Sequence, residues 1–530
     1  MAPATTVALL LEDDNFDDGA RASAARGSGG SAARSSRLSA ADRLSLREHG
    51  SSWTVFVWDS FLLMFGGTQL GYAMGQMGWA WGSFWLLFSI VSTFFSGHIL
   101  GELCNDTGAG SYPELGYEIL GRFGEILVSF MQWAGYYLTG VVQIAFTGAV
   151  WDQTFAGAAF AAPICAWQWM LITFVVLLPL MQIPAFTQFG ALALVASVVT
   201  LYSTAVYLAE IVQHGAYSGG RDSGWPAGVA LPCYDQVTTA GMLAAVPNMA
   251  FTFSGHGTFP EQIRELRDPG EFHRGFNVLY GLAVPFYALC ALLAMWAFGN
   301  MNSANFLENL SDTTALRVGM YLGLFLNFPG VVLGQVVLML KVELPLGVLP
   351  IDWWVSTSDA HRDSRAAALV RRVPPVLFRA VFRTCYLGSL LVVAEALIGA
   401  GLAVYVNIAG SLGLAAMTFW MPYLLWLCRC YQRGAPRSKA ARLRRGALAL
   451  FYTINATGGV FISLTGLWYN LDALALEAAA HQLRWFHELH CKEGAHFWGS
   501  EMWDPSLPVN STAYQTLIVG CCVNGTSCGA

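Results

Sequence analysis

Charged residues are scarce in this sequence: Asp, Glu, Lys and Arg make up only 12% of the 530 residues, whereas 55% are hydrophobic. A soluble protein carries roughly 25% charged residues, so half of the usual solubilising charge is missing. This shortage excludes a soluble globular protein. The 33 Phe and 19 Trp add apolar bulk of the kind that also lines membrane interfaces. The composition therefore indicates a polytopic membrane protein.

Motifs for catalysis and metal binding are also lacking in the apolar segments. These segments contain no His-Glu-x-x-His sequence, and no Gly-x-Ser-x-Gly sequence lies close to a histidine. HELHC at 487–491 has a spacing that fits no established zinc-ligand pattern. We predict that the chain is not an enzyme, has no catalytic residue, metal site or cofactor, and binds no nucleic acid.

The two ends of the chain differ from its middle. Residues 1–50 carry an acidic cluster, LEDDNFDD, followed by repeated Arg, Ser and Ala without apolar periodicity. Such a composition cannot bury enough surface to fold alone, so we predict a disordered cytosolic tail. Residues 51–470 are predicted to form the transmembrane domain, and residues 471–530 a cysteine-containing extracytosolic tail.

Eleven apolar stretches of about 20 residues are long enough to cross a bilayer as helices. They lie at 55–79, 83–103, 124–150, 167–186, 189–212, 238–258, 276–299, 317–340, 381–406, 409–428 and 447–470. Only Phe186 to Gln188 separate the fourth stretch from the fifth, which predicts a tight turn there. The expected fold is an all-α bundle of eleven transmembrane helices.

The basic residues alternate between the connections of these spans. The N-terminal tail holds six Lys and Arg, the second connection one, the sixth three, and the eighth (Lys341 to Arg383) and tenth seven each. These connections hold 24 of the 28 basic residues, and they all fall on one side of the membrane. Because Lys and Arg mark cytosolic loops, we predict a cytosolic N-terminus and an extracytosolic C-terminus.

Cysteines and glycosylation sequons agree with this orientation. Sequons occur in the C-terminal tail at Asn510 and Asn524 and in another outer loop at Asn309. The tail also holds four cysteines, and an oxidising compartment permits disulfides there, with Cys165 and Cys233 as further candidates. Four tail cysteines allow three pairings, and the sequence does not choose among them.

Two spans carry glycine-rich interruptions at matching places. The first span contains GGTQLG at 66–71, and the sixth contains FSGHG at 253–257 after Pro247. Glycine-interrupted segments at corresponding places in two halves point to the binding site of a transporter. They correspond if the core consists of two five-helix repeats, spans 1–5 and 6–10, with span 11 added. The alternative is that these glycines only allow close helix packing.

An unwound segment inside a membrane is tolerated where it lines a cavity or is covered by protein. Its N–H end suits a carboxylate and its C=O end suits an ammonium group or a cation, so a zwitterion or an organic acid fits best. The candidate substrate-binding residues are Gly66, Gly67, Thr68, Gln69, Ser254, Gly255 and His256.

Four ionisable residues in or near the spans are candidates for proton coupling, because charges inside a membrane are costly and usually functional. His256 titrates near neutral pH and sits at a break, although it could instead be a packing residue. Glu261 lies one and a half turns further on and could equally pair with Arg264. Asp59 lies in the first turns of span 1, where a helix N-terminus would stabilise its charge. Glu395 is predicted to lie mid-span with no basic residue within a turn.

Several motifs together carry a family resemblance. They are YAMGQMGW at 72–79, SYPELGYEILGRFG at 111–124, FSGHGTFPEQI at 253–263, MWAFGN at 295–300 and FWMP at 419–422. In order and spacing they resemble the amino acid/auxin permease family over residues 53 to 470. WDSF at 58–61, the His256/Glu261 spacing and the cysteine-bearing tail lean toward the auxin-influx branch, whereas YAMGQMGW leans toward general amino-acid permeases.

The resemblance implies a LeuT-like inverted-repeat fold with broken helices 1 and 6. It also implies symport of a small carboxylate-bearing substrate with protons by alternating access, driven by the proton gradient. The expected partners are an amino acid or organic acid, protons and the lipid bilayer. An auxin (indole-3-acetic acid) influx carrier and a transporter-like nutrient receptor stay open as alternatives. We expect the plasma membrane rather than the vacuolar or another endomembrane.

Overall fold

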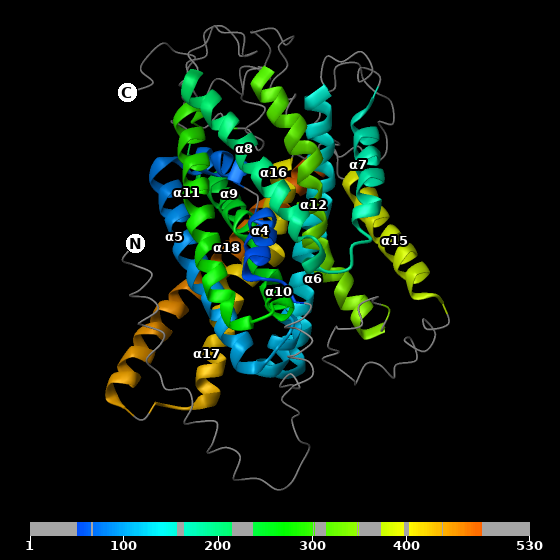
Figure 1. Cartoon of the computed structure of the whole chain (residues 1–530). Helices are drawn as coiled ribbons and strands as arrows, with labels where there is room; N and C mark the ends of the chain where they lie inside the picture. Colours follow the sequence, from blue (N-terminus) through cyan, green and yellow to red (C-terminus); the bar gives the residue numbers. More distant parts are fainter. Residues whose placement is uncertain are drawn as a thin grey trace, which may run out of the picture.

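The computed structural model describes residues 50–64, 67–155, 164–214, 237–299, 302, 314–346, 348, 373–396, 402–436 and 438–479. The predictions for the N-terminal tail, Gly66, Cys233, the four tail cysteines and the sequons at Asn309, Asn510 and Asn524 lie outside these residues. Throughout the described ranges the named elements are helical, and they run up and down as one bundle (Figure 1). Six of the described helices are long and apolar enough to cross a membrane.

The first half of the bundle begins with a short helix, α4 (Trp53–Leu63), and a 3-10 turn, η1 (Gly67–Gln69). The elements that follow are α5 (Leu70–Thr107), α6 (Tyr112–Phe155), α7 (Ala166–Leu180), η2 (Phe186–Gln188) and α8 (Gly190–His214). Helix α5 bends at Gly78, whose φ of 70° is in the left-handed region that favours glycine. The first predicted span is therefore interrupted before η1 and joined to the second through this kink. The tight turn predicted at Phe186 to Gln188 is confirmed as η2.

The second half starts with α9 (Thr239–Thr252), the 3-10 segment η3 (Ser254–Thr258) and α10 (Phe259–Glu265). The remaining elements are η4 (Pro269–Glu271), α11 (Phe272–Phe298), α12 (Thr314–Leu346), α15 (Pro375–Ala396), α16 (Leu402–Ala409), the π-helical η6 (Gly410–Leu414) and η7 (Ala416–Trp420), α17 (Met421–Arg433) and α18 (Lys439–Ala479). The sixth predicted span is thus interrupted at η3. The count of eleven spans and the five-plus-five repeat stay predictions.

The described part of the ninth predicted span is α15, from Pro375 to Ala396, and the description resumes with α16 at Leu402. Glu395 is therefore next to residues outside the description, and its mid-span position stays a prediction. The last helix, α18, extends to Ala479, beyond the predicted limit at 470.

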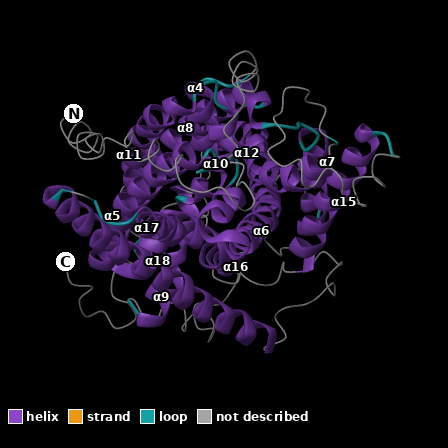
Figure 2. Cartoon of the chain, turned by 90° about the horizontal axis from the view of Figure 1, so that it is seen from below, coloured by secondary structure: helices purple, strands orange, loops and turns teal. Residues whose placement is uncertain are grey.

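One end of the bundle gathers polar contacts between helix termini. Arg429 and Arg433 of α17 both bind Asp106 near the end of α5, with 2.9 Å between Arg429 Nε and Asp106 Oδ2. At the same end, Arg383 of α15 donates to the backbone carbonyls of Met181 and Ile183 just after α7. Helices α7 and α15 lie together at one side of the bundle, whereas α10 lies near its middle (Figures 1 and 2).

The opposite end carries Cys165, the residue before α7, which is disulfide-bonded as the sequence suggested. The other described cysteines are free thiols. The disulfide partner of Cys165 therefore lies outside the described residues.

Candidate functional site

The interruption of the first span is held by a tyrosine from another helix. Helix α4 stops where the Met64 amide closes its last turn on the carbonyl of Ser60, at 3.0 Å. The Met64 carbonyl then has no helical partner, and it accepts a hydrogen bond from the Tyr287 hydroxyl of α11. Gly67 lies against the same ring, because a Cβ atom there would be 3.0 Å from Tyr287 Cδ1. A side chain at position 67 would crowd the ring that caps the break.

Of the other predicted residues in this break, Gln69 ends η1 and is 5% exposed. Its Oε1 atom is buried and has no hydrogen-bond partner within the described part of the chain. Thr68 belongs to the backbone of η1, and its side chain lies outside the description. Buried polar atoms are nearly always paired, so Gln69 Oε1 is a candidate for a contact outside the described residues.

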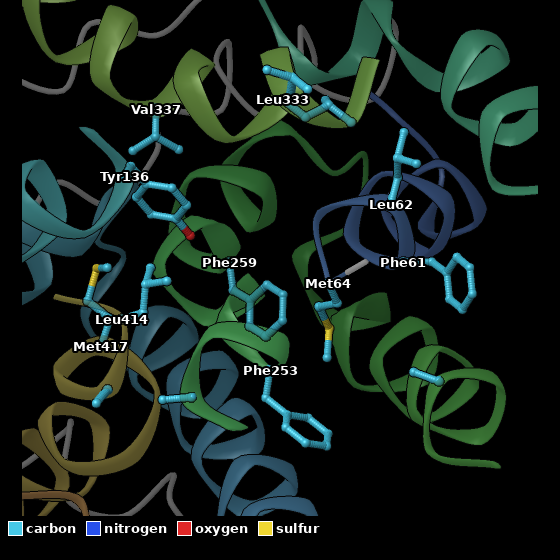
Figure 3. Packing of buried hydrophobic residues seen from close by; sticks show 14 of the residues in the cluster. Phe61, Leu62, Met64, Tyr136, Phe253, Phe259, Leu333, Val337, Leu414 and Met417 are labelled. Atoms are coloured by element: carbon cyan, nitrogen blue, oxygen red, sulfur yellow. The ribbon is translucent and has the colours of Figure 1, made fainter. Parts of the chain in front are cut away.

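The interruption of the sixth span is held by two side chains of α6. The Ser254 carbonyl accepts from the Tyr136 hydroxyl at 3.1 Å, and the Gly257 carbonyl accepts from Gln132 Nε2 at 2.6 Å. Figure 3 shows the Tyr136 hydroxyl pointing toward this segment. Within η3, Thr258 Oγ1 donates to the Gly255 carbonyl at 2.8 Å. The unwound carbonyls are therefore satisfied by side chains, as buried backbone must be.

The two interruptions meet in space. A Cβ atom on Gly255 would be only 2.9 Å from Met64 Cγ, so the sixth span touches the end of α4 directly. Met64, Phe253 and Phe259 are fully buried there, and Figure 3 shows their side chains between the two broken spans. Residues about 190 positions apart in the sequence thus form one centre, as the matching glycines predicted.

His256 is fully buried and links η3 to α5. Its Nδ1 atom lies 3.1 Å from the Phe253 carbonyl, and its Nε2 atom lies 2.8 Å from the Thr93 carbonyl. A carbonyl oxygen only accepts, whereas a neutral imidazole donates from one nitrogen, so only the protonated ring would satisfy both contacts. The ring also packs beside Phe259 and Phe276. In this conformation both nitrogens are engaged with backbone.

Glu261 is buried on α10 and only half satisfied. Its Oε1 accepts from Gln132 Nε2 at 3.0 Å and from the Tyr112 amide at 3.3 Å. Its Oε2 and the buried Nζ of Lys341 on α12 have no hydrogen-bond partner among the described residues. The charges of Lys341 and Arg264 act on Glu261. The carboxylate therefore lies between α6, α10 and α12, and one of its oxygens has no hydrogen-bond partner among the described residues.

Asp59 and Glu395 have contrasting surroundings. Asp59 of α4 is 1% exposed, its Oδ1 has no partner in the described structure, and the charge of Glu265 acts on it. Glu395 of α15 is partly exposed. Its mid-span position stays a prediction, because the residues that follow Ala396 lie outside the description.

Sequence reasoning missed five residues of this centre. They are Gln132, Tyr136, Glu265, Tyr287 and Lys341. All are polar groups in or beside apolar helices, which is a signal in itself. Their partners, however, are backbone atoms on distant spans, and no local pattern identifies those.

Two interrupted helices that meet within a bundle of membrane-length helices are characteristic of secondary transporters. The chain matches the family described as "Transmembrane amino acid transporter protein" over residues 49–468, and it belongs to that family. It is a multi-pass integral membrane protein.

Two relatives and one solved structure are similar to parts of the chain. Amino acid transporter AVT1B of Arabidopsis thaliana is 25% identical over 263 residues, 47% of this chain and 45% of the relative. Amino acid transporter AVT1J of the same plant is 23% identical over 255 residues, 47% of this chain and 58% of the relative. The matches therefore span about half the length of these relatives. A manganese transporter of Eremococcus coleocola is 12% identical, with a TM-score of 0.34 over 80% of this chain and 95% of its own.

Proposed function

We propose that the protein is a secondary active transporter that moves amino acids or related carboxylate-bearing small molecules together with protons by alternating access. The observation that carries this proposal is the meeting of the two broken spans at Met64 and Gly255. Family membership supports the substrate class. The runner-up substrate is the auxin indole-3-acetic acid, which is also a small carboxylate.

The backbone of this centre suits a zwitterion. The carbonyls of Met64 and Ser254 are at present bonded to the hydroxyls of Tyr287 and Tyr136. A substrate ammonium group would take the place of such a hydroxyl, because it donates more strongly to a carbonyl. The amide ends of the half-helices attract its carboxylate. Gln69, with a buried oxygen to spare, would complete the contacts to the substrate.

The proton route we propose passes the buried acids and His256. Glu395 lies twelve residues after Arg383 on α15, and the protons would pass it first on their way in. His256 already has both nitrogens against carbonyls, so protonation would add a hydrogen bond, and its loss would break one between η3 and α5. Asp59 and Glu261 would receive the proton toward the other end, each through an oxygen that the fold leaves unbonded.

We propose that the end bearing Arg264, Arg383 and Arg429 faces the cytosol, following the excess of basic residues there. The disulfide of Cys165 at the opposite end supports this orientation, because disulfides persist in oxidising compartments. The N-terminus would then be cytosolic and the C-terminus extracytosolic. We place the protein in the plasma membrane.

The test is uptake of radiolabelled amino acids by membrane vesicles that contain the full chain, with and without an inward proton gradient. A competition panel of neutral, acidic and basic amino acids against indole-3-acetic acid then identifies the substrate. We expect gradient-dependent uptake that a protonophore abolishes and that His256→Ala reduces. Uptake that ignores both the protonophore and this substitution would refute proton coupling, and competition by indole-3-acetic acid alone would favour the auxin carrier.

A further inference from the structure

Glu265, at the end of α10, joins three parts of the proposed cytosolic end. Its carboxylate Oε2 accepts from the backbone amide of Thr187 at 2.9 Å. Thr187 lies in η2, the short turn just before α8, so the carboxylate binds this turn from another segment. Its backbone carbonyl accepts from the Ser51 amide at 2.8 Å, just before α4. Glu265 thereby holds α10, α8 and the entry to α4 together.

The contacts of the Glu265 backbone and side chain differ in what can break them. Ser51 is paired on both sides, because its carbonyl also accepts from the Arg267 amide at 2.9 Å. These are bonds between backbone groups, which no proton removes. The bond to Thr187 depends on the charge of one carboxylate. The backbone hydrogen bond between Ser51 and Glu265 is therefore independent of protonation, whereas the hydrogen bond from Thr187 weakens when the Glu265 carboxylate is protonated.

A second carboxyl group acts on this one. Asp59 of α4 and Glu265 are each 1% exposed, and their charges repel one another. Asp59 Oδ1 and Glu265 Oε1 are both buried without a hydrogen-bond partner in the described part of the chain. Two buried carboxylates whose charges interact cannot both keep a charge cheaply, which favours retention of a proton by the pair.

The other charged group acting on Glu265 is Arg264 of its own helix, which Glu261 and Glu114 also attract. The segment η2 contributes no charge, since its residues are Phe, Thr and Gln. Among the described residues, Arg264 is thus the charged group that supports the charge of Glu265, and Asp59 is the acid on which the charge of Glu265 acts.

We propose that Glu265 and Asp59 form a proton-binding latch at the inner end of the transport path. As a carboxylate, Glu265 holds α10 on η2 and keeps that end closed. A proton on Glu265 weakens the bond to Thr187, because a neutral carboxyl group accepts less strongly than an anion. The closed end then opens, the proton leaves to the cytosol, and the latch closes again. This inference rests on the proposed function, since it names the proton site that would couple to it.

The latch predicts opposite effects for two substitutions. Glu265→Gln keeps the shape but loses the charge, so the amides of η2 should exchange hydrogen about five-fold faster at fixed pH. Asp59→Asn removes the competing charge, keeps Glu265 ionised and should slow the same exchange. Glu271→Gln, on a partly exposed carboxylate of η4 six residues further on, should leave it unchanged. A purely structural role would make both buried variants exchange faster.

The measurement is hydrogen exchange of the peptide covering residues 186–188 in the full-length protein in lipid nanodiscs, together with the pH profile of uptake. We expect the profile of Glu265→Gln to flatten and that of Asp59→Asn to move to lower pH. Equal exchange and equal profiles for wild type and both variants would overturn the latch. Absence of amino-acid uptake by the wild type would instead overturn the proposed function, while the exchange data still decide on the latch.

Discussion

Two regions of the molecule bury carboxylates, and they differ in how many of the carboxylate oxygens have hydrogen-bond partners. At the side formed by α7, α12 and α15, Glu343 meets Arg383 in a two-pronged pair of 2.6 and 2.7 Å. Arg383 is fully buried, and its remaining nitrogen donates to the carbonyls of Met181 and Ile183 at 2.5 and 2.6 Å. Both charged groups of this pair have all their hydrogen-bond partners in the described structure.

The centre of the bundle holds its acids differently. Asp59, Glu261 and Glu265 each keep one buried oxygen without a hydrogen bond in the described structure. The first region therefore resembles a fixed joint, in which a buried pair has all its partners. The second retains unsatisfied groups, which natural proteins rarely keep without a function. We propose that this difference separates the scaffold from the parts that move during transport.

The largest expected effect comes from removing one partner of the buried pair Glu343 and Arg383. Arg383→Met removes both hydrogen-bonded contacts of the buried Glu343 carboxylate, and it should lower the free energy of unfolding by about 3–5 kcal/mol. Thermal unfolding in detergent measures this loss. The neighbouring Arg379→Met is the control, since Arg379 Nε lies 3.6 Å from Glu343, and its loss should cost less than half as much. Equal losses in the free energy of unfolding would mean that Arg383 contributes no more to stability than Arg379 does.

Substitution of a glycine tests the central region at constant charge. A Cβ atom on Gly257 would lie 2.7 Å from Tyr136 Cε2 and 2.8 Å from Met417 Sδ. Gly257→Ala should therefore displace Tyr136, cost about 1–3 kcal/mol, and reduce the uptake rate about ten-fold or more. Gly281→Ala on α11 has nothing within 4 Å of its Cβ, so it should transport like the wild type. Normal uptake by Gly257→Ala would show that transport does not depend on the position of Tyr136 beside η3.

The tyrosine caps give the smallest expected effect. Tyr136→Phe removes the hydroxyl that the substrate ammonium group would displace from the Ser254 carbonyl, so the apparent substrate affinity should rise about five-fold, the equivalent of about 1 kcal/mol. The next residue provides the control, because Tyr137 donates to Ser389 Oγ at 3.2 Å, away from the breaks. Tyr137→Phe should leave the affinity unchanged. Saturation curves of uptake compare the two variants, and identical curves would argue against a role for the cap.

The sequence predicted the breaks because their causes are local. Glycines at 66–71 and 253–257 weaken a helix wherever they occur, and both interruptions are found. The same local reading counted Arg383 among the loop charges, although this residue is buried in a helix.

The partners of the breaks could not be predicted in this way. Tyr287 caps a carbonyl 223 positions away, and Tyr136 caps one 118 positions away. Such contacts depend on which helix faces lie together, and periodicity cannot assign faces when most of a helix is apolar. The carboxyl pair of Asp59 and Glu265 escaped notice for the same reason.

The central claim is that the unsatisfied centre exists to move a substrate with protons. The most direct measurement reconstitutes the purified full chain into liposomes loaded with a pH-sensitive dye and adds amino acids outside without a preset gradient. We predict acidification of the interior that follows the uptake of the amino acid and that disappears with Glu265→Gln. Uptake of the amino acid with no change in internal pH would contradict this account.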